Sequence, residues 1–156
     1  MPGEALLIGI ATVAVVVAGF AAIAPGMASD RSAWTAGQRY RLRGIVSTSF
    51  NVTFESLLPV VLYPALGDDR KALVVSSALV FVYALIIITT RTRQAIQAGV
   101  IRVRWTQFIV VAGYASTTLF GLNALAFGSL TGYGLALLIQ LSVAAISFYT
   151  LLASSV

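Results

Sequence analysis

Residues 5–25 read ALLIGIATVAVVVAGFAAIAP, an uncharged run in which almost every side chain is apolar. A helix needs about 20 mostly apolar residues to cross the hydrocarbon core of a bilayer. Four further segments satisfy this criterion, and the first of these, residues 44–64, is the least apolar because polar residues run through its first half. The sequence therefore predicts an all-α, polytopic integral membrane protein, a bundle of five transmembrane helices at about 5–25, 44–64, 72–90, 106–127 and 132–153.

The composition supports the same class. The 156-residue chain is 59% hydrophobic and 10% charged, whereas soluble domains carry about 25% charged residues to maintain a hydrated surface. No connection between the spans is long enough to fold separately, so residues 1–156 are predicted to form a single transmembrane helical domain. The net charge of +5 comes from arginines in short connections and not from a basic groove. We therefore expect the lipid bilayer, and not nucleic acid, as the partner.

Several kinds of chemistry are excluded by residue type. The chain has no cysteine and no histidine, which excludes disulfides, thiolate chemistry, imidazole metal sites and Ser-His-Asp nucleophiles. The single lysine, Lys71, falls at a predicted helix end and not in mid-membrane. Paired mid-membrane aspartates are also missing. We expect no enzyme, no catalytic residue, no metal site and no cofactor.

The arginines predict the orientation in the cell membrane. They fall in two groups, Arg31, Arg39, Arg41 and Arg43 in the first connection and Arg91, Arg93, Arg102 and Arg104 in the third. Short loops rich in Lys and Arg remain cytoplasmic, and five spans place the first and third connections on the same side. The prediction is an outside N-terminus and a cytoplasmic C-terminus. The preference for Arg over Lys and the richness in Ala and Val are typical of a prokaryotic source.

Aromatic residues are expected to mark both interfaces, because Trp and Tyr rings are amphipathic. The sequence assigns Trp34, Tyr40, Trp105 and Tyr149 to the inner interface and Tyr63, Phe127 and Tyr133 to the outer one. Arg102, Arg104 and Trp105 are predicted to contact anionic lipid, on a short interfacial helix before the fourth span.

The second span contains the most unusual residue. Residues 43–63 read RGIVSTSFNVTFESLLPVVLY, in which Ser47, Asn51 and Glu55 are spaced by four and so lie along one helix face. Glu55 falls close to the middle of the span, where a charge costs about 2.5 kcal/mol or more. A carboxyl group there must face the bundle interior, pair with another group, or stay protonated. We therefore take Glu55, Asn51 and Ser47 as the ion- or ligand-interacting candidates.

Pro59 adds a second polar group beside Glu55. A proline has no backbone N–H, so it leaves the carbonyl four residues earlier, that of Glu55, without its helical partner. A carbonyl and a carboxyl at one level of the membrane suit a cation or an ordered water. Side chains able to donate a hydrogen bond to Glu55 are predicted at similar depth on the other helices: Tyr83, Tyr114, Thr117 and Gln140.

Two interpretations of Glu55 remain open at this point. Intramembrane ionisable residues mark ion or proton pathways in many membrane proteins. Polar side chains also hold helices together without any further role. Asp68 and Asp69 have a simpler explanation, because acidic residues after Gly67 are expected to cap the N-terminus of the third helix.

The leading functional hypothesis is a small channel or transporter-like protein for ion transport, acting as a homo-oligomer with Glu55 as the ion- or proton-interacting group. Five helices can hardly enclose a wide aqueous pore, which favours a conduction path at an oligomer axis. The alternative is a non-catalytic accessory or sensor subunit of a larger membrane complex. A third hypothesis is a pocket for a lipid or small apolar ligand between helices.

Overall fold

The computed structural model describes residues 1, 3–27, 36–97, 99 and 104–153, and the elements in these ranges are helices. They are α1 (Glu4–Met27), α2 (Ala36–Leu66), α3 (Asp69–Gln97), α4 (Arg104–Leu122), the short π-helix η3 (Asn123–Phe127) and α5 (Leu130–Ala153). Five helical segments are long and apolar enough to cross a membrane. The predicted all-α bundle of five spans is confirmed, and the chain is a multi-pass membrane protein.

Two helices are longer than predicted. The second begins at Ala36 instead of residue 44, and the third continues to Gln97 instead of ending at residue 90. The 31 residues of α2 correspond to about 46 Å at 1.5 Å per residue, against a hydrocarbon core of about 30 Å. The apolar part of α2 is therefore extended by a polar, arginine-bearing segment that continues as helix.

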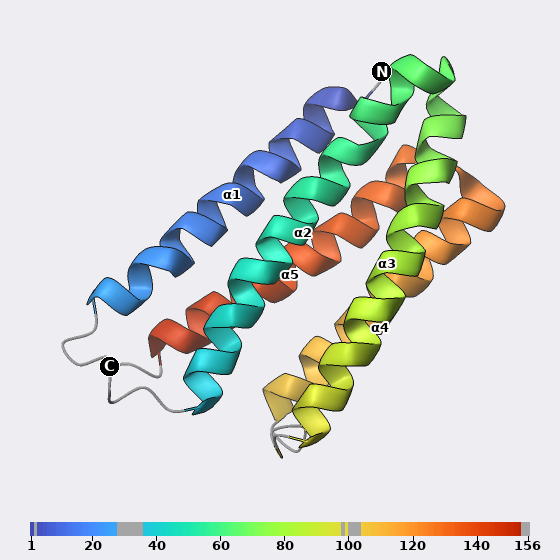
Figure 1. Cartoon of the computed structure of the whole chain (residues 1–156). Coiled ribbons are helices and arrows are strands. Elements are labelled where there is room, and N and C mark those ends of the chain that lie inside the picture. The colour runs from blue at the N-terminus through green and yellow to red at the C-terminus, as the bar shows by residue number, and fades with distance from the viewer. Residues whose placement is uncertain (2, 28–35, 98, 100–103, 154–156) are drawn as a thin grey trace.

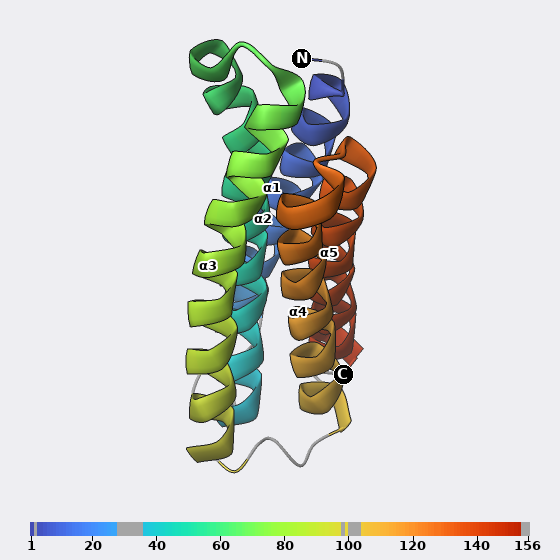
Figure 2. The same cartoon turned by 90° about the vertical axis from the view of Figure 1, so that its right-hand side faces the viewer.

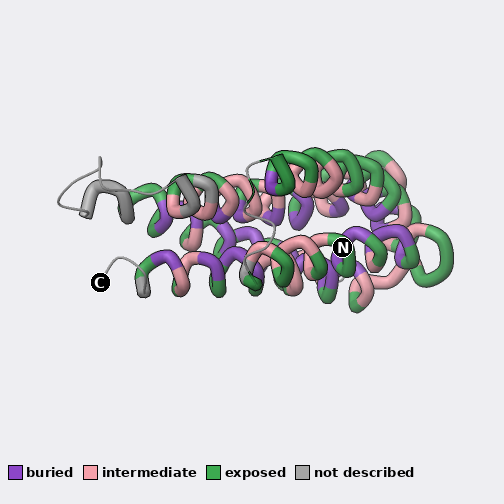
Figure 3. The backbone as a smooth tube through the Cα atoms, turned by 90° about the horizontal axis from the view of Figure 1, so that it is seen from below, coloured by how far each residue is buried: buried purple, intermediate pink, exposed green. Residues whose placement is uncertain are grey.

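Helices α2, α3, α4 and α5 follow one another around a ring, in which α5 packs again on α2. Helix α1 covers the outer side of α2 and α5 (Figure 1). In Figure 2 the helices run nearly side by side along the length of the bundle. Buried positions lie on the sides of the helices that face each other, and exposed positions lie outside (Figure 3). The outer positions include large apolar side chains such as Phe54, Val61 and Val111, as expected where lipid replaces water.

The two ends of the bundle differ in charge. One end, called here the arginine end, carries the start of α2, the end of α3 and the start of α4, and its described arginines are Arg39, Arg41, Arg43, Arg91, Arg93 and Arg104. At the other end, α2 is joined to α3 by a tight turn at Gly67, whose φ of 65° favours glycine. The backbone N–H of Lys71 donates to Asp68 Oδ1 at 2.7 Å, so the predicted cap of α3 by Asp68 is confirmed.

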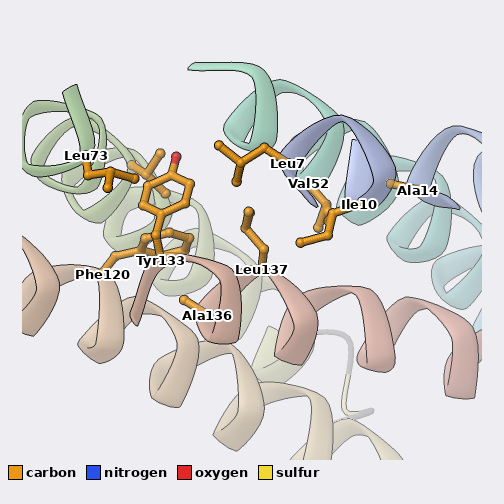
Figure 4. Packing of buried hydrophobic residues seen from close by; sticks show 10 residues of the cluster. Leu7, Ile10, Ala14, Val52, Leu73, Phe120, Tyr133, Ala136 and Leu137 are labelled. Atoms are coloured by element: carbon orange, nitrogen blue, oxygen red, sulfur yellow. The ribbon is translucent and has the colours of Figure 1, made fainter. Parts of the chain in front are cut away.

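Packing also differs between the two halves. Away from the arginine end, one buried cluster joins all five helices and includes Leu7, Val52, Leu73, Phe120 and Tyr133 (Figure 4). The rings of Phe120 and Tyr133 meet edge to face with centroids 5.1 Å apart. Near the arginine end the buried cluster consists of Ala21, Ile45 and Leu151, from α1, α2 and α5 alone. Helices α3 and α4 diverge from α2 and α5 toward this end (Figure 1).

Candidate functional site

Glu55 faces the interior of the bundle. Its side chain, on α2, is 1% exposed, and Gln140 Nε2 of α5 donates to its Oε2 at 2.9 Å. Among the residues that the structure describes, no lysine or arginine forms an ion pair with Glu55. The carboxyl group is thus held by a neutral amide in the interior of the bundle.

The backbone carbonyl of Glu55 also has a partner on α5. Pro59 lies inside α2 and cannot donate to this carbonyl, and the hydroxyl of Tyr133 donates to it instead at 2.6 Å. Tyr133 is 0% exposed, so its assignment to the outer interfacial belt was wrong. Tyr133 and Gln140 are seven residues apart, which places them on one face of α5. That face binds Glu55 at both its carbonyl and its carboxyl group.

The other proposed partners do not bond the carboxyl group of Glu55 in the described part of the protein. Tyr83 donates its hydroxyl to Asn51 Oδ1 at 3.1 Å, and Tyr114 is 38% exposed on the outer face of α4. Thr117 donates to the carbonyl of Gly113 in its own helix at 2.8 Å. Of the four side chains that the sequence analysis named, the structure brings Gln140 to the carboxyl group.

The polar stripe on α2 divides between two neighbouring helices. Ser47 accepts a hydrogen bond from Arg91 of α3, and Asn51 accepts the one from Tyr83, also on α3. Each step of four residues turns the side chain by about 40° around the helix axis, because 3.6 residues make one turn. From Ser47 to Glu55 the rotation is about 80°, which is enough to move the side chain from the α3 side to the α5 side.

Glu55 lines a cavity of about 80 Å³ between α2, α3, α4 and α5, called here the deep cavity. Its polar lining includes Asn51, Arg91, Thr117 and Gln140. The structure thus gathers two of the proposed site residues, Glu55 and Asn51, and two of the proposed partners, Thr117 and Gln140, around one space. Ser47 is outside this lining and instead lines a shallower groove along α2.

A second cavity, of about 150 Å³, lies nearer the arginine end and is called here the mouth cavity. The two cavities are adjacent, since they share the lining residues Thr48, Ile88, Arg91, Ile109 and Val143. Both volumes exceed what one water molecule requires. On the far side of Glu55 lies the buried cluster of Leu137, Phe120 and Tyr133. The two cavities therefore lie one after the other between the arginine end and Glu55, and packed side chains lie beyond Glu55.

The sequence did not identify Arg91 as a site residue. Its position at a predicted helix end indicated only how the protein is oriented in the membrane. The available signal was that Arg91 lies at the level of Ser47, on the neighbouring antiparallel helix. Of the predicted lipid-contacting residues, Arg104 is exposed in the first turn of α4. Arg102 and the side chain of Trp105 lie outside the described part of the protein.

The chemistry available at the site is that of a carboxyl group, two amides, two hydroxyls and a guanidinium around a small cavity. In the described ranges, no three Asp, Glu, His or Cys side chains come together as ligands for a metal ion. The carboxyl group of Glu55 can take up or release a proton, and the amides and hydroxyls around it can hydrogen-bond a small polar molecule. Comparison of the chain with protein-family models, with curated proteins and with solved structures found no match.

Proposed function

We propose that this protein is a small channel or transporter-like membrane protein, in which Glu55 is the group that binds a proton or cation. The observation that carries the proposal is the place of this carboxyl group. It is buried and lines the deep cavity, which is adjacent to the mouth cavity nearer the arginine end.

Charge and depth support this role. A carboxyl group far from water must be hydrogen-bonded, paired or protonated, and a neutral amide from Gln140 is the partner that Glu55 has. A neutral donor can hold either the protonated or the ionised form, so a proton or cation can come and go without breaking a fixed ion pair. A residue that served packing alone would not need the adjoining cavity.

The arrangement favours access from one side at a time. The route from the arginine end reaches Glu55, and the cluster of Leu137, Phe120 and Tyr133 fills the space beyond it. By the positive-inside rule, the arginine end faces the cytoplasm of the cell membrane. In this proposal the described form is open toward the cytoplasm, and transport requires the helices to separate around that cluster.

The route lies within one chain, between α2, α3, α4 and α5. The conduction path at an oligomer axis, expected from the sequence, stays a prediction. Homo-oligomerisation would then stabilise the bundle in lipid or couple several such routes. Cross-linking in native membranes, followed by determination of the mass of the complex, distinguishes a monomer from a homo-oligomer.

The test is proton and cation flux in liposomes that contain the purified protein and a trapped pH-sensitive dye. We expect Glu55→Gln to lower the flux to the level of protein-free liposomes. The matched control is Glu4→Gln, because Glu4 is also a glutamate on a spanning helix but lies 46% exposed at the helix start. This control should keep the wild-type flux.

Equal flux in the wild-type protein and in Glu55→Gln would refute the role of Glu55. A wild-type protein that carries no flux, but is isolated with a foreign membrane subunit in fixed ratio, would instead support the accessory-subunit hypothesis. Both results are obtained from the same preparation, provided that it is purified in mild detergent.

A further inference from the structure

The mouth cavity carries an excess of positive charge. Three arginines, Arg41, Arg43 and Arg91, are among its lining residues. No acidic side chain is found among the described residues that line it, and none of these arginines forms an ion pair within the described part of the chain. Several positive charges around one partly enclosed space raise the local concentration of anions.

Arg91 is oriented by the protein. Its Nη2 donates to Ser47 Oγ across the contact between α2 and α3, and the side chain lines both cavities. A guanidinium has five N–H donors, so this bond leaves others for a ligand. An oriented arginine is the side chain that best binds phosphate or carboxylate oxygens in pairs.

The remaining wall of the mouth cavity is mostly apolar. Ile45, Ile88, Ile109, Val110 and Val143 contribute side chains from all four surrounding helices. A cavity with cationic groups and an aliphatic wall matches a ligand with an anionic head and an apolar part. Inorganic phosphate would leave the apolar wall without a partner.

We propose that the mouth cavity is a binding site for a small amphipathic organic anion. Its phosphate or carboxylate head contacts Arg41, Arg43 and Arg91, and its short apolar part lies against Ile88, Ile109 and Val143. This inference goes beyond the role of Glu55, because the binding requires no flux and does not involve Glu55, which is outside the lining of the mouth cavity.

The experiment uses the full-length protein in nanodiscs of phosphatidylcholine, which has no net charge, and titrates it with octyl phosphate in a calorimeter. Two compounds serve as controls: inorganic phosphate has the head alone, and octyltrimethylammonium has the same tail with a cationic head. We expect saturable binding of octyl phosphate, and binding of both controls that is at least about tenfold weaker.

The protein variants test the assignment to residues. Arg91→Gln should weaken binding by about tenfold or more, the value of a charge-assisted hydrogen bond. The double variant Arg41→Gln/Arg43→Gln should do the same, and it leaves the hydrogen bond from Arg91 to Ser47 in place. Arg93→Gln is the matched control, because Arg93 is exposed at the same end and outside the cavity lining. It should bind like the wild type.

Two sources of such an anion are distinguished by adding phosphatidic acid to the nanodiscs. Competition with octyl phosphate assigns the site to a lipid headgroup, and unchanged octyl phosphate binding assigns it to a soluble ligand. The proposal is overturned if octyl phosphate does not bind, if it binds no better than octyltrimethylammonium, or if the cavity variants bind like Arg93→Gln. Glu55→Gln should bind normally, so loss of flux and loss of binding are separate results.

Discussion

The hydrogen bond from Tyr133 to the Glu55 carbonyl predicts that substitutions of Tyr133 on α5 and Pro59 on α2 have non-additive effects on the free energy of unfolding. Tyr133 donates to this carbonyl at 2.6 Å because Pro59 cannot. Replacing Tyr133 with Phe removes the donor and keeps the ring against Phe120. Replacing Pro59 with Ala restores a backbone N–H that can bond the same carbonyl.

The magnitude follows from the burial of this bond. Interhelical hydrogen bonds in membranes contribute about 0.6 kcal/mol on average and up to about 1.7, and an unsatisfied buried acceptor costs about 1–3 kcal/mol. Tyr133 is fully buried, so Tyr133→Phe should lower the free energy of unfolding by about 1–1.5 kcal/mol. In the Pro59→Ala background the same change should cost less than about 0.5 kcal/mol, because the carbonyl keeps a donor.

The assay is reversible unfolding of the four proteins of this double-mutant cycle in mixed micelles, with sodium dodecyl sulfate as denaturant and circular dichroism as readout. The cycle cancels the separate effect of Pro59→Ala on the helix. Tyr149→Phe is the control, since Tyr149 is 72% exposed and should change stability by no more than about 0.5 kcal/mol. Additivity of the two substitutions within about 0.3 kcal/mol would refute the reasoning.

Two further predictions concern the ends of the bundle. Asp68→Ala should lower the free energy of unfolding by about 0.5–2 kcal/mol, because Asp68 Oδ1 accepts a hydrogen bond from the N–H of Lys71. Asp68→Ser should keep most of the stability, since serine can also cap a helix. The same micelle assay measures both variants, and an equal loss in the two would contradict a capping role. Because the chain has no cysteine, single cysteines at Arg93 and Lys71 can report orientation through a membrane-impermeant maleimide. In intact cells the cysteine at position 71 should react and that at position 93 should react only after permeabilisation, and the reverse pattern would show that the arginine end faces outward.

Much of the site could be anticipated from one helix. The position of Glu55 in a long apolar segment required it to face other helices, and the spacing of Pro59 identified a carbonyl in need of a donor. Both statements depend on local geometry, which a single helix already contains. The sequence did not identify Tyr133 as the donor. Tyr133 lies 78 residues further along the chain, and its position near the start of a predicted span suggested the outer membrane interface instead.

The same limit explains the stripe of Ser47, Asn51 and Glu55. Spacing by four predicts one helix face, and the structure shows that this face meets two helices. Ser47 and Asn51 bond side chains of α3, and Glu55 bonds Gln140 of α5. The rotation of about 40° per step was available from the sequence. The sequence does not show which neighbouring helix faces the side chain at each of these angles.

The sequence by itself determined the number of spans, the cap of the third helix and the burial of Glu55. These follow from apolar length, from capping and from the cost of a charge in lipid, which act within one segment or between that segment and its solvent. Only the tertiary structure decided that Tyr133 and Gln140 bind Glu55 and that Arg91 lines a cavity leading to it. These contacts depend on how five helices rotate and diverge as they pack. In lipid that arrangement is set by close side-chain fit across the bundle, since all the outer faces are alike in their apolar character.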